Sequence, residues 1–166
     1  VVMGGSIREG GNVTPVAEAN MFNDPQAASR VLTAGWPLTL VGLDATHRCV
    51  LTPAHMARIA TGQGELGRVL ARSYAFYRDF YQTFLGIDGC CPHDSCALAW
   101  LLRPELFTTA RGHLDVVTEG IAEGQTLFAP EGCAYAQQRW SSTPPVEVCL
   151  DARGDAVSDW ITEVLG

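Results

Sequence analysis

The apolar positions of the chain form short runs that alternate with segments of helical periodicity. An apolar run at 1–3 ends in a pair of glycines, which indicates a buried strand followed by a turn. The run at 38–43 is typical of a strand that is buried on both faces of a parallel sheet. Apolar residues recur at helical spacing over 65–85 and again over 93–102. The pattern therefore predicts strands and helices in alternation.

Residues that favour helix starts place further elements. Asp24 before Pro25 predicts a helix that begins at this pair and continues to about Ala34. Pro53 predicts the start of another helix, which continues to about Thr61. The other expected elements are a helical turn at 15–20, strands at 115–118, 125–128 and 146–150, a loop at 129–145 and a closing helix at 155–165.

The order of these elements predicts a single α/β unit over 1–166. Strand, helix and strand follow one another in the manner of parallel sheets, so we expect an open, mostly parallel sheet flanked by helices. No internal repeat or low-complexity tract divides the chain. The chain starts inside an expected core strand, with Val1 rather than Met, so we expect that an upstream portion of the domain is absent.

Composition and charge limit the classes of binding partner and the cellular location that we expect. Hydrophobic residues make up 47% and charged residues 17%, which is a globular composition. The net charge is −7 with 11 Lys and Arg residues, so no basic surface for nucleic acid or an anionic membrane is expected. The sequence has no apolar run of transmembrane length and no secretory leader. With six cysteines expected to be reduced, the predicted location is the cytoplasm.

Polar side chains follow the first strand, at the end of a parallel strand where ligands of open sheets bind. Asn12, Glu18 and Asn20 offer amide and carboxylate groups to one small polar ligand, and sugar hydroxyls suit this set. The alternative is structural, with Asn12 serving a turn and Asn20 capping an element.

The pair His93 and Asp94 opens an expected helix. An imidazole can give a proton to a leaving group near neutral pH, and a carboxylate is a hard ligand for Ca²⁺ or Mg²⁺. The alternative is that Asp94 caps the helix and His93 is an ordinary surface histidine.

Two further clusters allow more than one interpretation. Cys90, Cys91, His93 and Cys96 could bind zinc, but adjacent cysteines suit one metal poorly, so this interpretation is the weaker one. Three tyrosines at spacings of three and four share one helix face and either pack in the core or cover a flat ring; they are Tyr74, Tyr77 and Tyr81. No role is assigned to the histidines at 47, 55 and 113.

Several motifs in a fixed order together resemble one family, the inosine-uridine preferring nucleoside hydrolases. The motifs are Met3-Gly4-Gly5, Gly11-Asn12-Val13-Thr14-Pro15, Ala17-Glu18-x-Asn20, Asp24-Pro25-x-Ala27-Ala28, Val41-Gly42-Leu43-Asp44, His93-Asp94, Pro104-Glu105-Leu106-Phe107, Glu119-Gly120 and Gly124-Gln125-Thr126. The resemblance covers roughly the first 130 residues. It implies an open α/β sheet and an enzyme that cleaves the N-glycosidic bond of ribonucleosides to base and ribose.

The resemblance also implies a role for each matching residue. Asn12 and Glu18 would hold the ribose 5′-hydroxyl, and Asn20 would contact the 3′-hydroxyl. Asp94 would bind the Ca²⁺ that holds the ribose diol. His93 would protonate the departing base.

Two departures from the family pattern limit what the chain does alone. The family's Asp-x-Asp-Pro-Gly-x-Asp-Asp stretch, which supplies most metal ligands and the base that activates water, has no match. Ala19 stands where the family usually has Phe, which leaves the base preference open. We therefore expect an inactive C-terminal part of a nucleoside hydrolase domain that either self-associates as a homo-oligomer or pairs through an exposed sheet edge. The alternative is a non-catalytic module that binds ribose or a nucleoside.

Overall fold

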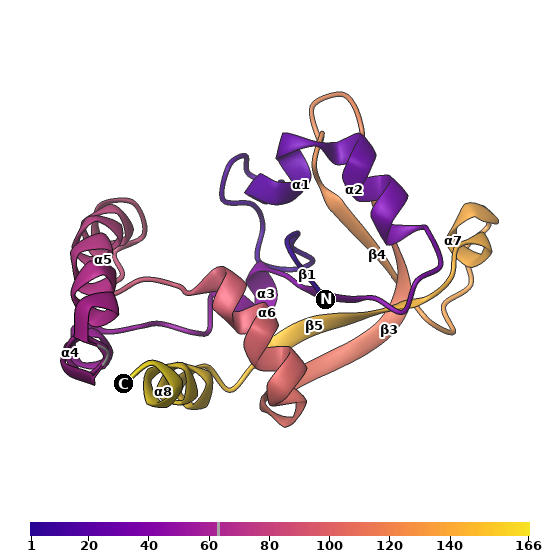
Figure 1. The fold of residues 1–166 in the computed structure, drawn as a ribbon. Helices are drawn as coiled ribbons and strands as arrows, with labels where there is room; N and C mark the ends of the chain where they lie inside the picture. Colours follow the sequence, from indigo (N-terminus) through magenta and orange to yellow (C-terminus); the bar gives the residue numbers. More distant parts are fainter. Residues whose placement is uncertain (63) are drawn as a thin grey trace.

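The structure, a computed structural model, describes residues 1–62 and 64–166, and within them it has an open five-stranded sheet (Figure 1). The order of strands along the sheet is β1-β2-β5-β3-β4. The strands are β1 (Val2–Met3), β2 (Thr39–Val41), β3 (Phe107–Val116), β4 (Thr126–Pro130) and β5 (Val146–Ala152). β1, β2 and β5 pair in parallel, whereas β3 is antiparallel to both β5 and β4. Within the described part, four strands thus share one direction, and the expected open, mostly parallel sheet is confirmed.

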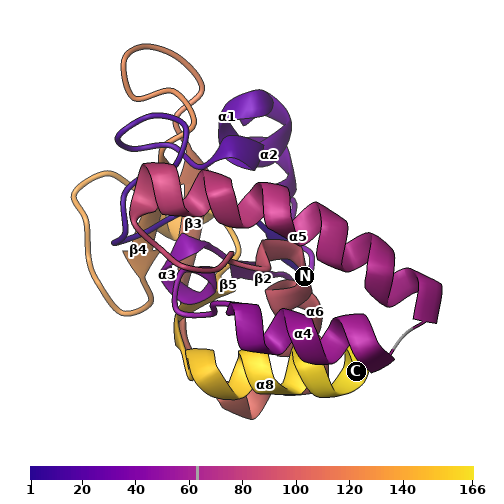
Figure 2. The same cartoon turned by 90° about the vertical axis from the view of Figure 1, so that its left-hand side faces the viewer.

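Helices cover both faces of this sheet. They are α1 (Ala19–Asn23), α2 (Pro25–Leu32), α3 (Leu43–Thr46), α4 (Pro53–Gly62), α5 (Gly64–Leu85), α6 (His93–Leu102), the 3-10 turn η1 (Pro104–Leu106), α7 (Arg139–Ser142) and α8 (Gly154–Leu165). α1 and α2 lie on one face, and α3, α6 and α8 lie on the other (Figure 1). α4 packs beside α8, and α5 crosses α4 on the side away from the sheet (Figure 2).

The alternation of side chains along β2 divides the core into two clusters. Leu40 packs with Leu32 and Val148 under α1 and α2. Val41 packs with Cys96 and Val157 under α3, α6 and α8. Because successive residues of a strand point to opposite faces, a strand this short needs apolar residues at both positions. This explains why β2 lies in the continuous apolar run at 38–43 from which a strand was predicted.

The expected helix start at Asp24 is confirmed. Oδ1 of Asp24 accepts a hydrogen bond of 2.9 Å from the backbone nitrogen of Ala27, and Pro25 occupies the first turn. The helix ends at Leu32, two residues before the expected end. Gly35 follows in the left-handed region with φ of +83°, which terminates the segment.

The expectation for 107–145 is wrong in two places. β3 begins at Phe107, eight residues before the expected start at Asp115. Its first half alternates polar and apolar side chains and shifts register between Thr108 and Thr109, so it lacks a continuous apolar run. The expected loop at 129–145 contains the tail of β4 and the short helix α7.

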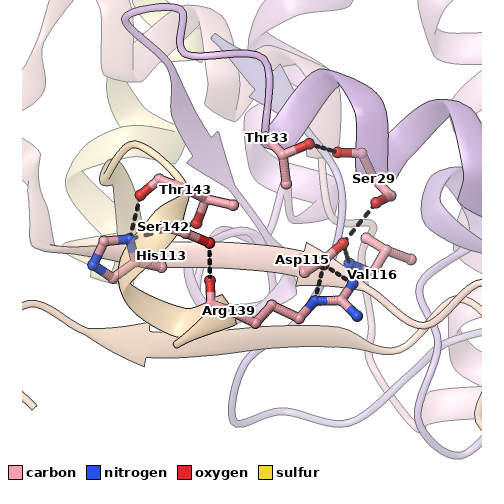
Figure 3. Close-up of polar contacts among 8 residues, drawn as sticks. All are labelled: Ser29, Thr33, His113, Asp115, Val116, Arg139, Ser142 and Thr143. Atoms are coloured by element: carbon pink, nitrogen blue, oxygen red, sulfur yellow. Dashed lines mark hydrogen bonds and ion pairs between the residues drawn. The ribbon is translucent and has the colours of Figure 1, made fainter. Parts of the chain in front are cut away.

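A buried carboxylate holds α7 against the sheet. Asp115 on β3 accepts hydrogen bonds from Oγ of Ser29 at 2.6 Å and from the guanidinium of Arg139 on α7 (Figure 3). Nearby, Nδ1 of His113 lies 2.6 Å from the carbonyl oxygen of Thr143. These are tertiary contacts between residues far apart in sequence, which no local pattern indicates.

Candidate functional site

The loops after β1 and β2 approach each other so closely that only glycine fits. The backbone nitrogen of Leu43 donates a hydrogen bond of 2.9 Å to the carbonyl oxygen of Gly5. A Cβ atom placed on Gly42 would lie 2.6 Å from that same oxygen. The carboxyl ends of these two parallel strands therefore lie side by side, and in open sheets such an edge is the usual place of a ligand crevice.

Glu18 is the most tightly held side chain at this edge of the sheet. Only 2% of it is exposed, and its Oε2 accepts hydrogen bonds from the backbone nitrogens of Gly5, Asn20 and Met21 at 2.9, 2.9 and 3.3 Å. Glu18 thus caps α1 and fixes the loop after β1 at the same time. All of these bonds go to Oε2, so within the described residues Oε1 stays available to a ligand.

The structure brings Asn12 and Asn20 to the same place. Oδ1 of Asn12 accepts a hydrogen bond of 3.0 Å from the backbone nitrogen of Ala19, so Asn12 does serve a turn, as the structural alternative expected. The side-chain nitrogen of Asn20 donates to the carbonyl oxygen of Met3 at 3.4 Å. Glu18, not Asn20, caps the helix. Both amide side chains are exposed and can still contact a ligand.

His93 is the first residue of α6 and lies between two hydroxyl groups. Its Nε2 is 2.7 Å from the hydroxyl of Tyr81, and its Nδ1 is 2.7 Å from Oγ1 of Thr46. Burial lowers the pKa of His93 to about 4, with a further contribution from the nearby His47 ring and a smaller opposing one from Asp94. The imidazole is therefore neutral at neutral pH.

The two parts of the site meet at α3. Its first residue, Leu43, is bonded to Gly5 on the Glu18 side, and its last residue, Thr46, is bonded to His93. Between them, Asp44 is 1% exposed, and its two oxygens each accept a hydrogen bond of 2.7 Å, from the backbone nitrogens of Ile7 and Arg8. Neither Asp44 nor Thr46 was singled out from the sequence. The position of Asp44 directly after a predicted strand was the available signal.

Asp94 is exposed and lines a cavity together with His93. Pro92 stands at the cap position of α6, and no side-chain bond caps this helix, so the capping alternative for Asp94 is wrong. The carboxylate of Asp94 is therefore free of a helix-capping role.

The cavity has a volume of about 500 Å³ and lies among α4, α5, α6 and α8. Its walls are largely apolar, and Tyr74 and Tyr77 of α5 line it. Tyr81 is 6% exposed and contacts His93 instead. Core packing, the first of the two alternatives for this face, holds for Tyr81, whereas Tyr77 is exposed beside the cavity and its contact with a flat ring stays a prediction.

The residues present do not complete a metal site. No three or more His, Cys, Asp or Glu side chains of the described residues are grouped to hold a metal ion. Both oxygens of Asp44 are occupied by backbone amides, and burial raises the pKa of Cys91 to about 12 and of Cys90 to about 11, which favours the thiol form. Ca²⁺ takes six to eight oxygen ligands, roughly, and Asp94 offers at most two of them.

Among the described residues, no helix combines the length and the apolar character needed to cross a membrane.

The sequence is similar to those of several known proteins. The sequence profile of the inosine-uridine preferring nucleoside hydrolases matches residues 1–159. The chain is 36% identical over 166 residues to the non-specific ribonucleoside hydrolase RihC of Escherichia coli, and the match covers 99% of this chain and 51% of RihC. It is 33% identical to the probable uridine nucleosidase 2 of Arabidopsis thaliana, with coverage of 99% and 52%.

Solved structures give the same picture. The fold is similar to that of the plant nucleoside hydrolase PpNRh1, with a TM-score of 0.91 and 30% identity over 98% of this chain and 52% of that one. It is also similar to a purine-preferring ribonucleoside hydrolase from Gardnerella vaginalis, with a TM-score of 0.85 and 27% identity over 98% and 50%. The chain spans about half the length of the relatives that it matches.

Proposed function

Since this chain belongs to the inosine-uridine preferring nucleoside hydrolase family, we propose that it supplies the ribose-facing and leaving-group-facing part of an enzyme that hydrolyses ribonucleosides to base and ribose. The observation that carries the proposal is that Glu18 and His93 are both linked to α3, Glu18 through Gly5 and His93 through Thr46. Its relatives are named as ribonucleoside hydrolases and nucleosidases, which supports the reaction class.

Glu18 would act on the sugar. Cleavage of a glycosidic bond passes through a transition state in which the ring carries positive charge. A buried carboxylate that is already fixed by backbone amides reorganises little as that charge develops, so its stabilising effect is larger than in water. With Oε1 available, Glu18 can accept a hydrogen bond from a ribose hydroxyl, and the amides of Asn12 and Asn20 lie beside it.

His93 would act on the base. A purine or pyrimidine leaves poorly as an anion, so a proton donor at the leaving group speeds the reaction. The ring of His93 lies between the hydroxyls of Tyr81 and Thr46, which hold its orientation. Nucleosides carry no phosphate, so the neutral hydroxyls around His93 suit such a substrate. For the same reason, the acidic chain needs no cluster of cationic side chains to bind it.

Ca²⁺ is proposed as the cofactor of the complete enzyme, where it would orient the ribose diol and lower the pKa of a bound water. Asp94 is the residue of this chain that would contribute a ligand. The described residues do not complete the coordination, so the other ligands and the base that activates water would come from an Asp-rich segment outside them. The domain boundary at 1–166 and the inactivity of this chain alone are parts of the same proposal.

A non-catalytic module that binds ribose is the second candidate. It is favoured by one observation: Asn12, Glu18 and Asn20 lie together entirely within the described residues, whereas a metal cluster does not. Location in the cytoplasm is also a proposal, supported by the cysteines, which are all free thiols in the part of the chain that the structure describes.

Calorimetry with ribose tests the sugar site directly. Asn20→Ala should weaken binding by about 10-fold, since a hydrogen bond contributes roughly 0.5–1.5 kcal/mol. Asn23→Ala is the matched control, because Asn23 is also exposed on α1. Equal affinities of the two variants would reject the sugar site.

Ribose release from inosine and uridine with Ca²⁺ tests whether this chain is active by itself. This chain alone should bind ribose and release none. Turnover by the chain alone at roughly 1 s⁻¹ or more, a usual enzyme rate, would overturn the claim that it is a part of the catalytic unit.

A further inference from the structure

The buried hydroxyl group of Thr46 contacts the ring of His93 and can fix the tautomer of that ring as well as its orientation. The side chain of Thr46 is fully buried at the end of α3, and Oγ1 lies 2.7 Å from Nδ1 of His93. Thr46 is separated from His93 by 47 positions, so the contact is made by the fold and not by a local motif.

Backbone hydrogen bonds along α3 fix the position of Thr46. Its backbone nitrogen donates to the carbonyl oxygen of Gly42 at 3.1 Å, and Leu43 is bonded to Gly5. Asp44, two residues before Thr46, accepts hydrogen bonds from the backbone nitrogens of Ile7 and Arg8. Because these contacts fix the backbone around Thr46, its side chain cannot follow the imidazole of His93 if that ring turns. Thr46 therefore acts as a fixed reference for the orientation of His93.

The two hydroxyls around His93 must take opposite roles. A neutral imidazole has one N–H donor and one acceptor nitrogen, and each ring nitrogen of His93 lies 2.7 Å from a hydroxyl oxygen. One hydroxyl therefore accepts from the ring and the other donates to it. The choice between them sets the tautomer.

Acidity decides which hydroxyl donates. A phenol with a pKa near 10 is a far stronger donor than an aliphatic alcohol, so Tyr81 donates to Nε2 and Thr46 accepts from Nδ1–H. The burial of Tyr81 raises the pKa of its hydroxyl, so the phenol stays protonated and has a hydrogen to donate.

We propose that Thr46 is a positioning residue that accepts a hydrogen bond from Nδ1–H of His93 and holds this ring in a single tautomer, with Nε2 facing Tyr81. The tautomer itself follows from the contacts. Its importance for the departing base rests on the proposed function: with Nδ1–H bonded to Thr46, Nε2 would be the one nitrogen that takes up a proton and then gives it to the leaving group.

Nuclear magnetic resonance of ¹⁵N-labelled histidine tests the tautomer without any assay of activity. The sequence has four histidines, and a His93→Gln variant identifies the signals of His93. Wild-type protein should show His93 protonated at Nδ1. Protonation mainly at Nε2 in the wild type would overturn the proposal, and this outcome needs no Thr46 variant to fold.

Two variants separate positioning from packing. Thr46→Val keeps the shape and removes the acceptor, so His93 should populate both tautomers. Thr46→Ser keeps the hydroxyl and should retain the single tautomer. A Thr46→Val protein that folds and keeps the wild-type tautomer would contradict the proposal, as would a Thr46→Ser protein that behaves like Thr46→Val.

Kinetics of the protein that releases ribose add a second readout. Thr46→Val should lower kcat by about 10- to 100-fold with little change in KM, and Thr46→Ser should restore kcat. Failure of the proposed function would abolish ribose release in the wild type too, while the tautomer measurement would keep its outcome. The two failures are therefore distinguishable.

Discussion

The carboxylate of Glu18 accepts a hydrogen bond of 2.9 Å from the backbone nitrogen of Gly5, 13 positions earlier in the chain. This contact joins the loop after β1 to the start of α1. It places an acceptor of the proposed ribose-binding set directly against the end of a core strand. Local folding and the proposed binding of the sugar would thus depend on the same side chain.

We expect Glu18→Gln to destabilise the protein. The amide keeps the shape of the side chain, but it bears an NH₂ group in place of one oxygen and a weaker acceptor in place of the other. Loss of charge-assisted bonds to buried amides costs about 1–3 kcal/mol, measurable as a lower midpoint in urea. Glu163→Gln, an exposed change on α8, should leave the midpoint within about 0.5 kcal/mol. Similar midpoints for the two variants would contradict the structural role of Glu18.

Asp115 gives an expected pH dependence of stability. Burial favours its neutral form, but hydrogen bonds from Ser29, Arg139 and the nitrogen of Val116 outweigh burial and lower the pKa of this carboxyl (Figure 3). A carboxyl whose pKa is lower in the folded state stabilises the protein above its unfolded pKa of 3.8, and the effect is lost as pH falls through the folded value.

Urea unfolding of wild type and Asp115→Asn at two pH values tests this. At pH 7 the wild type should be more stable by about 1–2 kcal/mol. The exposed Arg139 adds little, since surface ion pairs contribute roughly 0–1 kcal/mol. Near pH 3 the difference should shrink. Asp79→Asn, an exposed change on α5, serves as control and should show no such trend. A difference that is constant from pH 7 to pH 3 would exclude the titration of Asp115 as its cause.

Two glycine variants separate a steric clash from backbone strain. Gly42→Ala would place Cβ 2.6 Å from the oxygen of Gly5, so we expect a loss of about 1–3 kcal/mol together with weaker ribose binding. Gly120 has a φ of +85° with open space around it, so Gly120→Ala should cost only about 1 kcal/mol from its positive φ and leave ribose binding intact. Unchanged ribose binding in Gly42→Ala would show that the crossing of the two loops does not shape the site.

We also expect self-association, as a homo-oligomer or through the β1 edge of the sheet. Within the described residues β1 pairs with β2 on one side, and Met3 turns its backbone to the other side, where its carbonyl oxygen accepts a bond from Asn20. Light scattering over a range of concentrations should show a dimer or larger species. A monomer at all concentrations would contradict this expectation.

The sequence predicted what depends on local pattern. The run at 38–43 yields a strand because both of its faces are buried, and Asp24 with Pro25 starts a helix because capping involves neighbouring residues. Only the end of β3 was predicted, because the exposed side chains of Thr108 and Arg111 interrupt the apolar pattern of its first half. The helix α7 was missed because its anchor, Asp115, lies 24 positions away from Arg139.

The site shows the same division. Asn12, Glu18, Asn20, His93 and Asp94 stand in recognisable motifs, and the family they indicated is confirmed. Their roles in binding and catalysis stay predictions. Thr46 could not be selected from the sequence, because nothing in its neighbourhood differs from an ordinary turn. Tyr81 was singled out as one of three tyrosines on a helix face, but not as a partner of His93. Their contact with His93 exists only once α3, α5 and α6 pack together.

The single turn of α3 also limits which substrates the proposed site would accept. Leu43 supports the proposed sugar side and Thr46 supports the proposed leaving-group side, and three residue steps of the helix separate them by roughly 4.5 Å along its axis. Such a turn cannot lengthen to admit a larger base without moving the strand before it. In the proposed site, differences in base size would therefore be met along α5, where Tyr77 is exposed beside the cavity. Selectivity for the base and recognition of the sugar would consequently vary independently of each other.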